Sequence, residues 1–190
     1  MKFTVSKTEI VKALSSTLGV VEKRQALPIL SNVLLTVEDD NIFITATDLE
    51  SEVKTACIPT KVESTGSTTA PAKKLNELCR LLPDGSEIAI YLNGDKLSVE
   101  SGLGKYSMST LPSEDFPIFD VVSENTEFTI FGSVLRNLIS KTSFAMGNQD
   151  WRHYLNGMYL NIEDKNITAV TTDAHRLAIS TNTTTKSVSG

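Results

Sequence analysis

At the start of the chain, apolar side chains are spaced first as in a helix and then as in strands. Ser6 followed by Glu9 forms a capping box, in which each side chain can bond a backbone N–H at the start of a helix. The apolar positions at helical spacing that follow are Ile10, Val11, Leu14 and Leu18. Next, NVLLTVE and NIFITAT flank Asp39 and Asp40, which predicts a hairpin with a short polar turn, and SEVKTACIP continues the sheet.

Further along, the pattern predicts one more helix and then three strands. The segment KVESTGSTT is polar and is expected to be a loop. Pro71 takes the first helical position and Pro83 stops the helix. The apolar positions at helical spacing between them are Leu75, Leu78, Cys79 and Leu82. The runs EIAIYL, KLSVES and KYSMST are strands separated by glycine-containing turns. Strands outnumber helices, so we expect an α+β fold with two helices on one face of largely antiparallel sheet.

Two copies of one pattern lie 125 positions apart. The segment LSNVLLTVEDDNIFITATDLESEV, from Leu30, aligns without a gap with LNGMYLNIEDKNITAVTTDAHRLA, from Leu155. The identical pairs are Leu30/Leu155, Leu35/Leu160, Glu38/Glu163, Asp39/Asp164, Asn41/Asn166, Ile42/Ile167, Thr47/Thr172 and Asp48/Asp173. A period of this length predicts a duplicated domain. We expect a complete first domain over residues 1–122 and a truncated second domain over residues 126–190.

Composition then limits the classes of function. The 190 residues are 40% hydrophobic and 22% charged, which is ordinary for a globular protein. A net charge of −5 argues against a protein that grips nucleic acid over its whole surface, but it leaves room for a local basic face. No apolar run approaches the ~20 residues that span a bilayer, and MKFTVSKTE lacks a secretory apolar stretch. We therefore expect a cytoplasmic protein with no membrane partner.

The two cysteines and the short motifs give no sign of a cofactor. Cys57 and Cys79 form no CxxC pair and are expected to be buried thiols. GLG at Gly102 is followed by a strand pattern and lacks the third glycine of a phosphate loop, so it is expected to be a hairpin turn. No sequence motif for a metal ion or a nucleotide is present. We therefore expect neither a bound metal ion nor a bound nucleotide.

The segment TTDAHRLAI, residues 171–179, allows an enzymatic and a structural interpretation. If it is extended, Asp173, His175 and Leu177 share one face, and His175 could act as a base oriented by Asp173. The first copy, however, also has Asp at the matching position, Asp48, but no histidine. The shared Thr-Asp pair therefore favours a turn held by side chain to backbone hydrogen bonds. We expect a protein that is not an enzyme.

The segment MGNQDWRHYLNG, from Met146, leaves two interpretations open. In both copies the loop before the hairpin carries a cation, Arg24 or Arg152, among polar and aromatic residues. Arginine forks, amides and tyrosine hydroxyls suit contacts to phosphate and sugar, and aromatic faces can meet bases. The alternative is a solvated loop in which Trp151 and Tyr154 pack as core or as a lid.

Six motifs, in order along the whole chain, resemble the bacterial DNA polymerase III beta subunit, the sliding-clamp family. They are LPIL at Leu27, TDLE at Thr47, APAKKL at Ala70, STLPSEDFP at Ser109, YLNGM at Tyr154 and TDAHRLA at Thr172. The resemblance implies a protomer of three similar domains, of which this chain would hold the first and about half of the second. Two such protomers close head to tail into a ring around duplex DNA. The ring is a processivity factor without catalysis, and it slides because its contacts to DNA are weak and independent of sequence.

The resemblance also implies three sets of site residues. Those for contact with double-stranded DNA are Arg24, Lys73, Gln149, His153 and Tyr154. Those for a groove that binds partner peptides are Leu155, Thr172, His175, Arg176 and Leu177. Those for the contact between protomers of the homodimer ring are Lys74, Lys105, Tyr106 and Met108. The implied partners are the clamp loader, the polymerase III catalytic subunit, other polymerases and repair proteins.

Four positions depart from the family's usual pattern. Lys73 stands where Arg is usual, His153 where Tyr is usual, and Ala174 where Gly is frequent. Leu103 stands where a basic residue is often found. The implied groove and ring also use a third domain, so these 190 residues alone are expected to bind peptides weakly or not measurably and not to form the ring.

Overall fold

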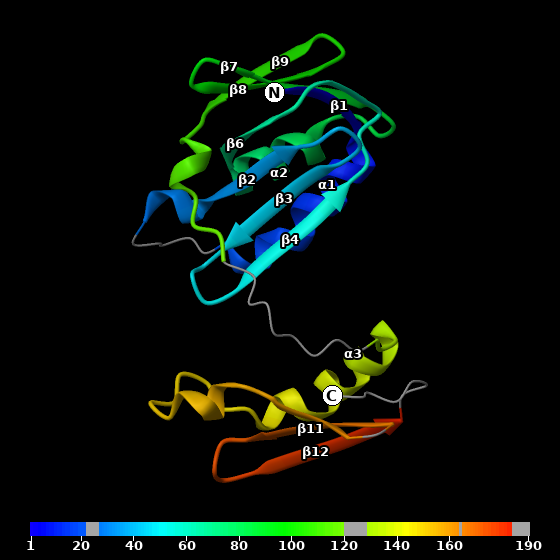
Figure 1. Ribbon diagram of the computed structural model, residues 1–190, viewed down its shortest axis with the longest axis vertical. Helices are drawn as coiled ribbons and strands as arrows, with labels where there is room; N and C mark the ends of the chain where they lie inside the picture. Colours follow the sequence, from blue (N-terminus) through cyan, green and yellow to red (C-terminus); the bar gives the residue numbers. More distant parts are fainter. Residues whose placement is uncertain (22–26, 120–128, 164, 184–190) are drawn as a thin grey trace. The chain divides into compact units, whose positions relative to one another are not determined.

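The computed structural model describes residues 1–21, 27–119, 129–163 and 165–183. The chain divides into two compact units, Met1–Asp120 and Val121–Gly190, which are described separately (Figure 1). Both are built from helices and antiparallel strands, as the sequence predicts.

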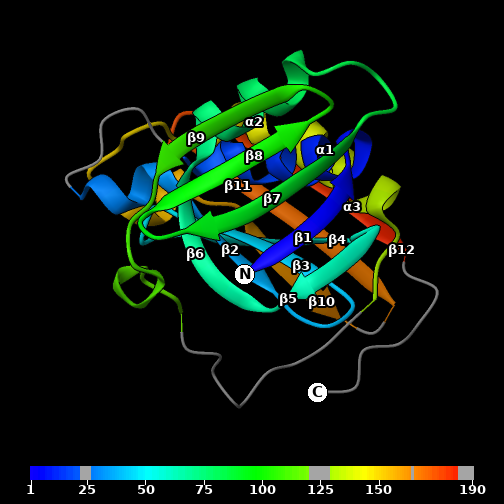
Figure 2. The same ribbon diagram turned by 90° about the horizontal axis from the view of Figure 1, so that it is seen from above.

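Unit 1 contains two antiparallel sheets, ordered β5-β1-β7-β8-β9 and β4-β3-β2-β6. Its strands are β1 Lys2–Ser6, β2 Asn32–Val37, β3 Ile42–Thr47, β4 Glu52–Cys57, β5 Lys61–Ser64, β6 Gly66–Pro71, β7 Glu87–Asn93, β8 Lys96–Ser101 and β9 Gly104–Ser109. Its helices are α1 Lys7–Thr17 and α2 Ala72–Leu81, with short 3-10 turns η1 Leu18–Val20, η2 Pro28–Ser31 and η3 Ser113–Asp115. Both α-helices lie on one face of the four-stranded sheet (Figure 1), and β1, β7, β8 and β9 run side by side (Figure 2).

One hydrophobic core joins both sheets and both helices of unit 1. Phe3 of β1, Ile44 of β3 and Ile90 of β7 are fully buried in it, together with Leu14 of α1 and Leu75 of α2. The predicted periodicities therefore select the buried faces correctly. Cys57 and Cys79 lie in the same core, and burial raises the pKa of each thiol to about 12, which keeps both unreactive.

The first helix begins as its sequence predicts. Ser6 is the N-cap of α1, and its Oγ accepts a hydrogen bond from the backbone N–H of Glu9 at 3.3 Å. This is the Ser6 half of the predicted capping box, and it satisfies one of the backbone donors that a helix leaves unpaired at its start.

Two predictions around residue 70 are wrong. KVESTGSTT is not a loop but forms β5 and the first part of β6, and Pro71 ends β6 and caps α2 instead of opening the helix. The strands are polar because their hydroxyl groups find partners: buried Thr69 accepts from Asn32 Nδ2 at 2.9 Å and donates to the carbonyl of Leu111 at 2.8 Å. Threonine also favours extended backbone.

Unit 2 repeats the first part of unit 1. It contains α3 Gly132–Thr142, β10 Tyr159–Glu163, β11 Asn166–Thr172 and β12 Leu177–Thr183, with 3-10 turns η4 Ser143–Ala145 and η5 His153–Asn156. The strands form an antiparallel sheet in the order β10-β11-β12, and α3 packs on it through Leu138, against Ile167 and Ala169 (Figure 1). The bounds of α3, η4 and η5 lie 125 positions after those of α1, η1 and η2. The predicted duplication is therefore confirmed.

The two copies differ in what covers the helix. Leu14 of α1 is 0% exposed because it shares a core with α2, whereas the matching Ile139 of α3 is 44% exposed. In the described part of unit 2, no helix takes the place of α2.

This difference predicts unequal costs for two matched truncations. Leu14→Ala should lower the free energy of unfolding by about 2–5 kcal/mol, because it leaves a cavity in a closed core. Ile139→Ala should lower it by about 1 kcal/mol or less, because the side chain is already partly in water. Urea unfolding followed by far-UV circular dichroism measures both, and equal losses would contradict the difference in burial.

Candidate functional site

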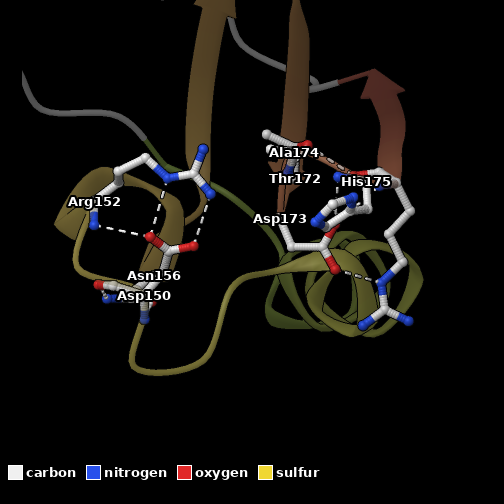
Figure 3. A network of polar contacts seen from close by, with 8 residues as sticks. Asp150, Arg152, Asn156, Thr172, Asp173, Ala174 and His175 are labelled. Atoms are coloured by element: carbon white, nitrogen blue, oxygen red, sulfur yellow. Dashed lines mark hydrogen bonds and ion pairs between the residues drawn. The ribbon is translucent and has the colours of Figure 1, made fainter.

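The segment between β11 and β12 is a tight turn. Thr172 Oγ1 accepts from the backbone N–H of Ala174 at 3.0 Å and donates to the carbonyl of Arg176 at 2.7 Å. Asp173 Oδ1 accepts from the backbone N–H groups of His175 and Arg176, each at 2.9 Å (Figure 3). These N–H groups hold the pKa of Asp173 below its usual value. The prediction of a turn capped by Thr and Asp is confirmed.

The same contacts exclude the extended arrangement that a catalytic pair would use. The Asp173 carboxylate binds the backbone of His175 and the Nε of Arg176, the latter at 2.9 Å, and among the hydrogen bonds of the described residues none joins it to the imidazole. An orienting carboxylate would have to bond a ring nitrogen of its histidine. The geometry therefore gives His175 no help as a base.

Unit 1 contains the same turn between β3 and β4. Thr47 Oγ1 accepts from Leu49 N–H at 3.1 Å and donates to the carbonyl of Ser51 at 2.9 Å, while Asp48 accepts from Glu50 and Ser51. Leu49 and Ala174 even share a positive φ, 74° and 72°. The Thr-Asp turn thus belongs to the common scaffold, and what unit 2 adds is the pair of exposed side chains that follow, His175 and Arg176.

The loop from Met146 to Asn156 is held by an ion pair. The Arg152 side chain donates two hydrogen bonds to the Asp150 carboxylate, one from Nε at 3.0 Å and one from a terminal nitrogen at 2.8 Å (Figure 3). Hydrogen bonds from the Arg152 side chain and from its backbone N–H lower the pKa of Asp150 to about 2. The fork of Arg152 is therefore already occupied, and the interpretation of Arg152 as a free phosphate-binding cation is wrong for this structure.

The aromatic residues of this loop do not form a core within unit 2. Trp151 is 82% exposed and Tyr154 is 77% exposed. Gln149, at φ 56°, and His153 are exposed on the same loop. The alternative in which these rings pack as core is therefore wrong for the described residues. The interpretation of this segment as a nucleic-acid contact stays a prediction.

A pocket of about 300 Å³ lies between this loop and the sheet. Its walls are Tyr154, Leu155, Gly157, Tyr159, Val170, Thr171 and Thr172. It brings together Leu155 and Thr172, which the resemblance assigns to the peptide groove, and Tyr154, which it assigns to DNA contact. Leu177, 59% exposed, pairs with Thr172 across the strands, whereas His175, Arg176 and Leu177 are not part of the pocket wall.

Four of the pocket residues were not predicted. Tyr159 and Val170 are a cross-strand pair of β10 and β11 and line the pocket together. The strand alternation places them on the face opposite Ile167 and Ala169, so the pattern contained the signal. Gly157 and Thr171 complete the wall, and neither carries a sequence signal that singles it out.

The remaining predicted DNA-contact residues divide between the units. Lys73 lies half-buried on α2 of unit 1, whereas Gln149, His153 and Tyr154 share the loop of unit 2. Arg24 lies outside the described residues.

The predicted protomer contact lies on α2 and on a free strand edge. Lys74 is exposed on α2, and the other three residues lie on β9, which is an edge of its sheet as described. Lys105 Nζ pairs with Glu100 at 3.2 Å, Tyr106 is exposed, and Met108 packs partly against the core. Leu103, at the turn before β9, is fully exposed. An edge strand offers unpaired backbone groups to another chain.

The described residues contain neither a metal-binding cluster nor a membrane-spanning helix. There, no group of three or more His, Cys, Asp or Glu side chains is arranged to hold a metal ion. Over the same residues, no helix has the length and apolar character to cross a membrane.

Comparison with known proteins places both units. Residues 1–120 match the family described as DNA polymerase III beta subunit, N-terminal domain, and residues 129–189 match the family described as DNA polymerase III beta subunit, central domain. The beta sliding clamps of Salmonella typhimurium and Escherichia coli are 43% and 42% identical to this chain over 179 residues. The match covers 94% of this chain and 49% of each relative. The chain thus spans about half the length of the curated relatives it matches.

A solved structure shows the same fold. The crystal structure of a sliding clamp, DNA polymerase III subunit beta, from Pseudomonas aeruginosa bound to griselimycin has a TM-score of 0.93 and 41% identity. The match covers 98% of this chain and 50% of that one.

The positive φ of Ala174 predicts a stabilising substitution. Ala174→Gly should raise the free energy of unfolding of unit 2 by up to about 1 kcal/mol, because glycine adopts this backbone without strain. The control is Ala178→Gly, since Ala178 lies in β12 and glycine weakens strand interiors. Urea unfolding followed by far-UV circular dichroism measures both variants, and a loss of stability in both would count against strain at Ala174.

Proposed function

The chain belongs to the DNA polymerase III beta subunit family, and on that premise we propose that it forms the first half of a sliding clamp. The clamp is a non-catalytic processivity factor that encircles duplex DNA and tethers the replicative polymerase. The observation that carries the proposal is the ordered match of both units to two successive domains of this family. Its setting would be the bacterial cytoplasm, as the sequence leads us to expect.

The charges of the chain support sliding instead of tight attachment. The net charge is −5, and two cations near the pocket, Arg152 and Arg176, are paired with carboxylates. A protein that binds DNA by its charge alone needs many free Lys and Arg contacts to phosphate, and its affinity falls steeply with salt. A closed ring needs few, because retention comes from topology. We propose Arg24, Lys73, Gln149, His153 and Tyr154 as these few DNA contacts.

The pocket between η5 and β11 is the candidate for partner binding. Its apolar wall includes Leu155 and Val170, and the Thr172 turn lies at its edge. Apolar walls with a few polar groups at the rim are typical of sites that bind short peptides. We propose that partner peptides from the clamp loader, polymerases and repair proteins bind here, with His175, Arg176 and Leu177 beside the pocket.

We propose the free edge β9 as the contact between protomers. Backbone groups on an edge strand can pair with a strand of a second protomer, while Lys74, Lys105, Tyr106 and Met108 supply side-chain contacts. A homodimeric ring of protomers of the relatives' length would bury this edge.

Retention on circular DNA tests the clamp proposal. We expect a protein of the relatives' full length, with this chain as its first half, to stay on nicked circular plasmid once a clamp loader has loaded it. Cutting the plasmid once should release the protein within minutes, because a ring slides off an end. Gel filtration of the protein–DNA mixture before and after cutting measures this, and equal retention on both forms would reject the ring.

The groove assignment predicts a selective loss of ligand binding. Griselimycin is the probe, because a Pseudomonas aeruginosa relative was solved bound to it. In the same full-length protein, Leu177→Ser should weaken griselimycin binding by roughly tenfold or more, the effect of removing about 1.4 kcal/mol of apolar contact. Ile58→Ser is the matched control, since Ile58 is an exposed apolar residue of unit 1. Isothermal calorimetry decides, and equal affinities for the two variants would exclude Leu177 from the site.

A further inference from the structure

Resting on the proposed function, we propose that Asp150 is a positioning residue. With Arg152 and Asn156 it forms what we call the Asp150 brace, which holds residues 147–156 as one rigid loop. The brace thereby fixes the DNA-facing and the groove-facing residues of this loop in a single arrangement.

The brace closes the loop with both side-chain and backbone contacts. Besides the fork of Arg152, Asp150 Oδ1 accepts the backbone N–H of Arg152 at 2.9 Å. Asn156 binds the backbone of Asp150 on both sides: its Oδ1 accepts from Asp150 N–H, and its Nδ2 donates to the Asp150 carbonyl, each at 2.9 Å (Figure 3). Both carboxylate oxygens of Asp150 and both polar atoms of the Asn156 side chain thus make hydrogen bonds within the loop.

The ends of the loop are also tied to each other. The backbone N–H of Gly147 donates to the carbonyl of Leu155 at 2.8 Å. A Cβ at position 147 would lie 3.0 Å from that carbonyl oxygen, a closer contact than most side chains make, so glycine fits this approach best. With the brace and this hydrogen bond in place, one part of residues 147–156 has little freedom to move without the rest.

Both proposed binding functions depend on this one loop. Gln149 and His153 are exposed on it, and both are proposed DNA contacts. Leu155, 7% exposed, forms the floor of the pocket, and Tyr154 is both a pocket residue and a proposed DNA contact. A change in the loop would therefore move both sets of residues together.

The duplicated sequence shows that the brace is not part of the shared scaffold. The residues 125 positions before Asp150, Arg152 and Asn156 are Gln25, Leu27 and Ser31, which cannot form an ion pair. The Thr-Asp turn, in contrast, has the same contacts in both units. The residues of the brace are thus particular to the second copy of the repeat, which supports a role in what this loop binds.

The first experiment measures the loop itself in the 190-residue chain. Trp151, the one tryptophan of the sequence, lies between Asp150 and Arg152, and its ring centroid is 5.6 Å from the Arg152 guanidinium carbon. We expect Asp150→Asn and Arg152→Gln each to increase the nanosecond motion of Trp151, seen as a faster decay of fluorescence anisotropy. The double variant should show no more motion than either single variant, because each single substitution already removes the same Asp150–Arg152 interaction. Asp84→Asn, which breaks the exposed Lys7–Asp84 pair of unit 1, should change nothing.

The second experiment measures binding in the full-length protein of the clamp test. Asp150→Asn should weaken griselimycin binding by about tenfold, as for the loss of a charge-assisted fork, and should shorten the lifetime on circular plasmid. Arg152→Lys keeps the charge but loses the fork, so it should behave like Asp150→Asn and not like the wild type. If Arg152 acted through its charge alone, Arg152→Lys would bind like the wild type. If the brace acted through global stability, the melting temperature of each variant would fall in proportion to its loss of binding.

Each outcome bears on the inference. Unchanged anisotropy in Asp150→Asn, or freed Trp151 motion with wild-type binding of both griselimycin and DNA, would overturn the positioning role. Loss of only one of the two binding activities would overturn the claim that one loop fixes both. A wild-type protein that fails both binding assays would instead reject the proposed function, which separates the two failures.

Discussion

In the Thr-Asp turns, the Thr and Asp side chains accept hydrogen bonds from the backbone N–H groups of the next residues, and this is the constraint on which the rest of the structure depends. They force the chain through a positive φ at Ala174 and return it as β12, so that Leu177 starts a strand directly beside Thr172. The matching turn at Leu49 does the same for β4 in unit 1. Because the backbone is fixed by side chains inside the turn, the residues at its tip and exit are free to differ between the units. Unit 2 uses that freedom for His175 and Arg176.

Local pairing of opposite charges is the second theme of unit 2. Asp150 and Asp173 each hold an arginine two or three positions away, and each also accepts backbone hydrogen bonds. Ion pairs that stay in contact with solvent, as these do, add little to global stability. Their larger effect is on shape, since each fixes the path of a short segment beside the pocket. Paired arginines also reduce the charge available to phosphate, which agrees with the proposed ring that holds DNA by enclosure.

Much of this could be predicted from the sequence, and the failures have physical causes. The core helices and the hairpins follow from apolar spacing, and the 125-residue offset locates α3, η4 and η5. The strand β6 was missed because Thr69 is buried through partners distant in sequence, Asn32 and Leu111. The role of Arg152 was missed because sequence shows a cation but not whether a carboxylate already occupies it. The pocket was predicted in part, through Leu155 and Thr172, because the facing strand β10 adds its wall only after pairing.

The duplication also explains why unit 2 has an apolar helix face in contact with water. Leu135 and Ile139 match Ile10 and Leu14, which are fully buried between α1 and the rest of the core in unit 1. An amphipathic helix normally buries such a stripe against a neighbouring element. The sequence of α3 is thus suited to a covering helix like α2, and a segment of that kind would return Ile139 to the burial of Leu14. Packing of α3 from that side would also support the sheet that carries the pocket, because α3 contacts β11 through Leu138 and Ile167.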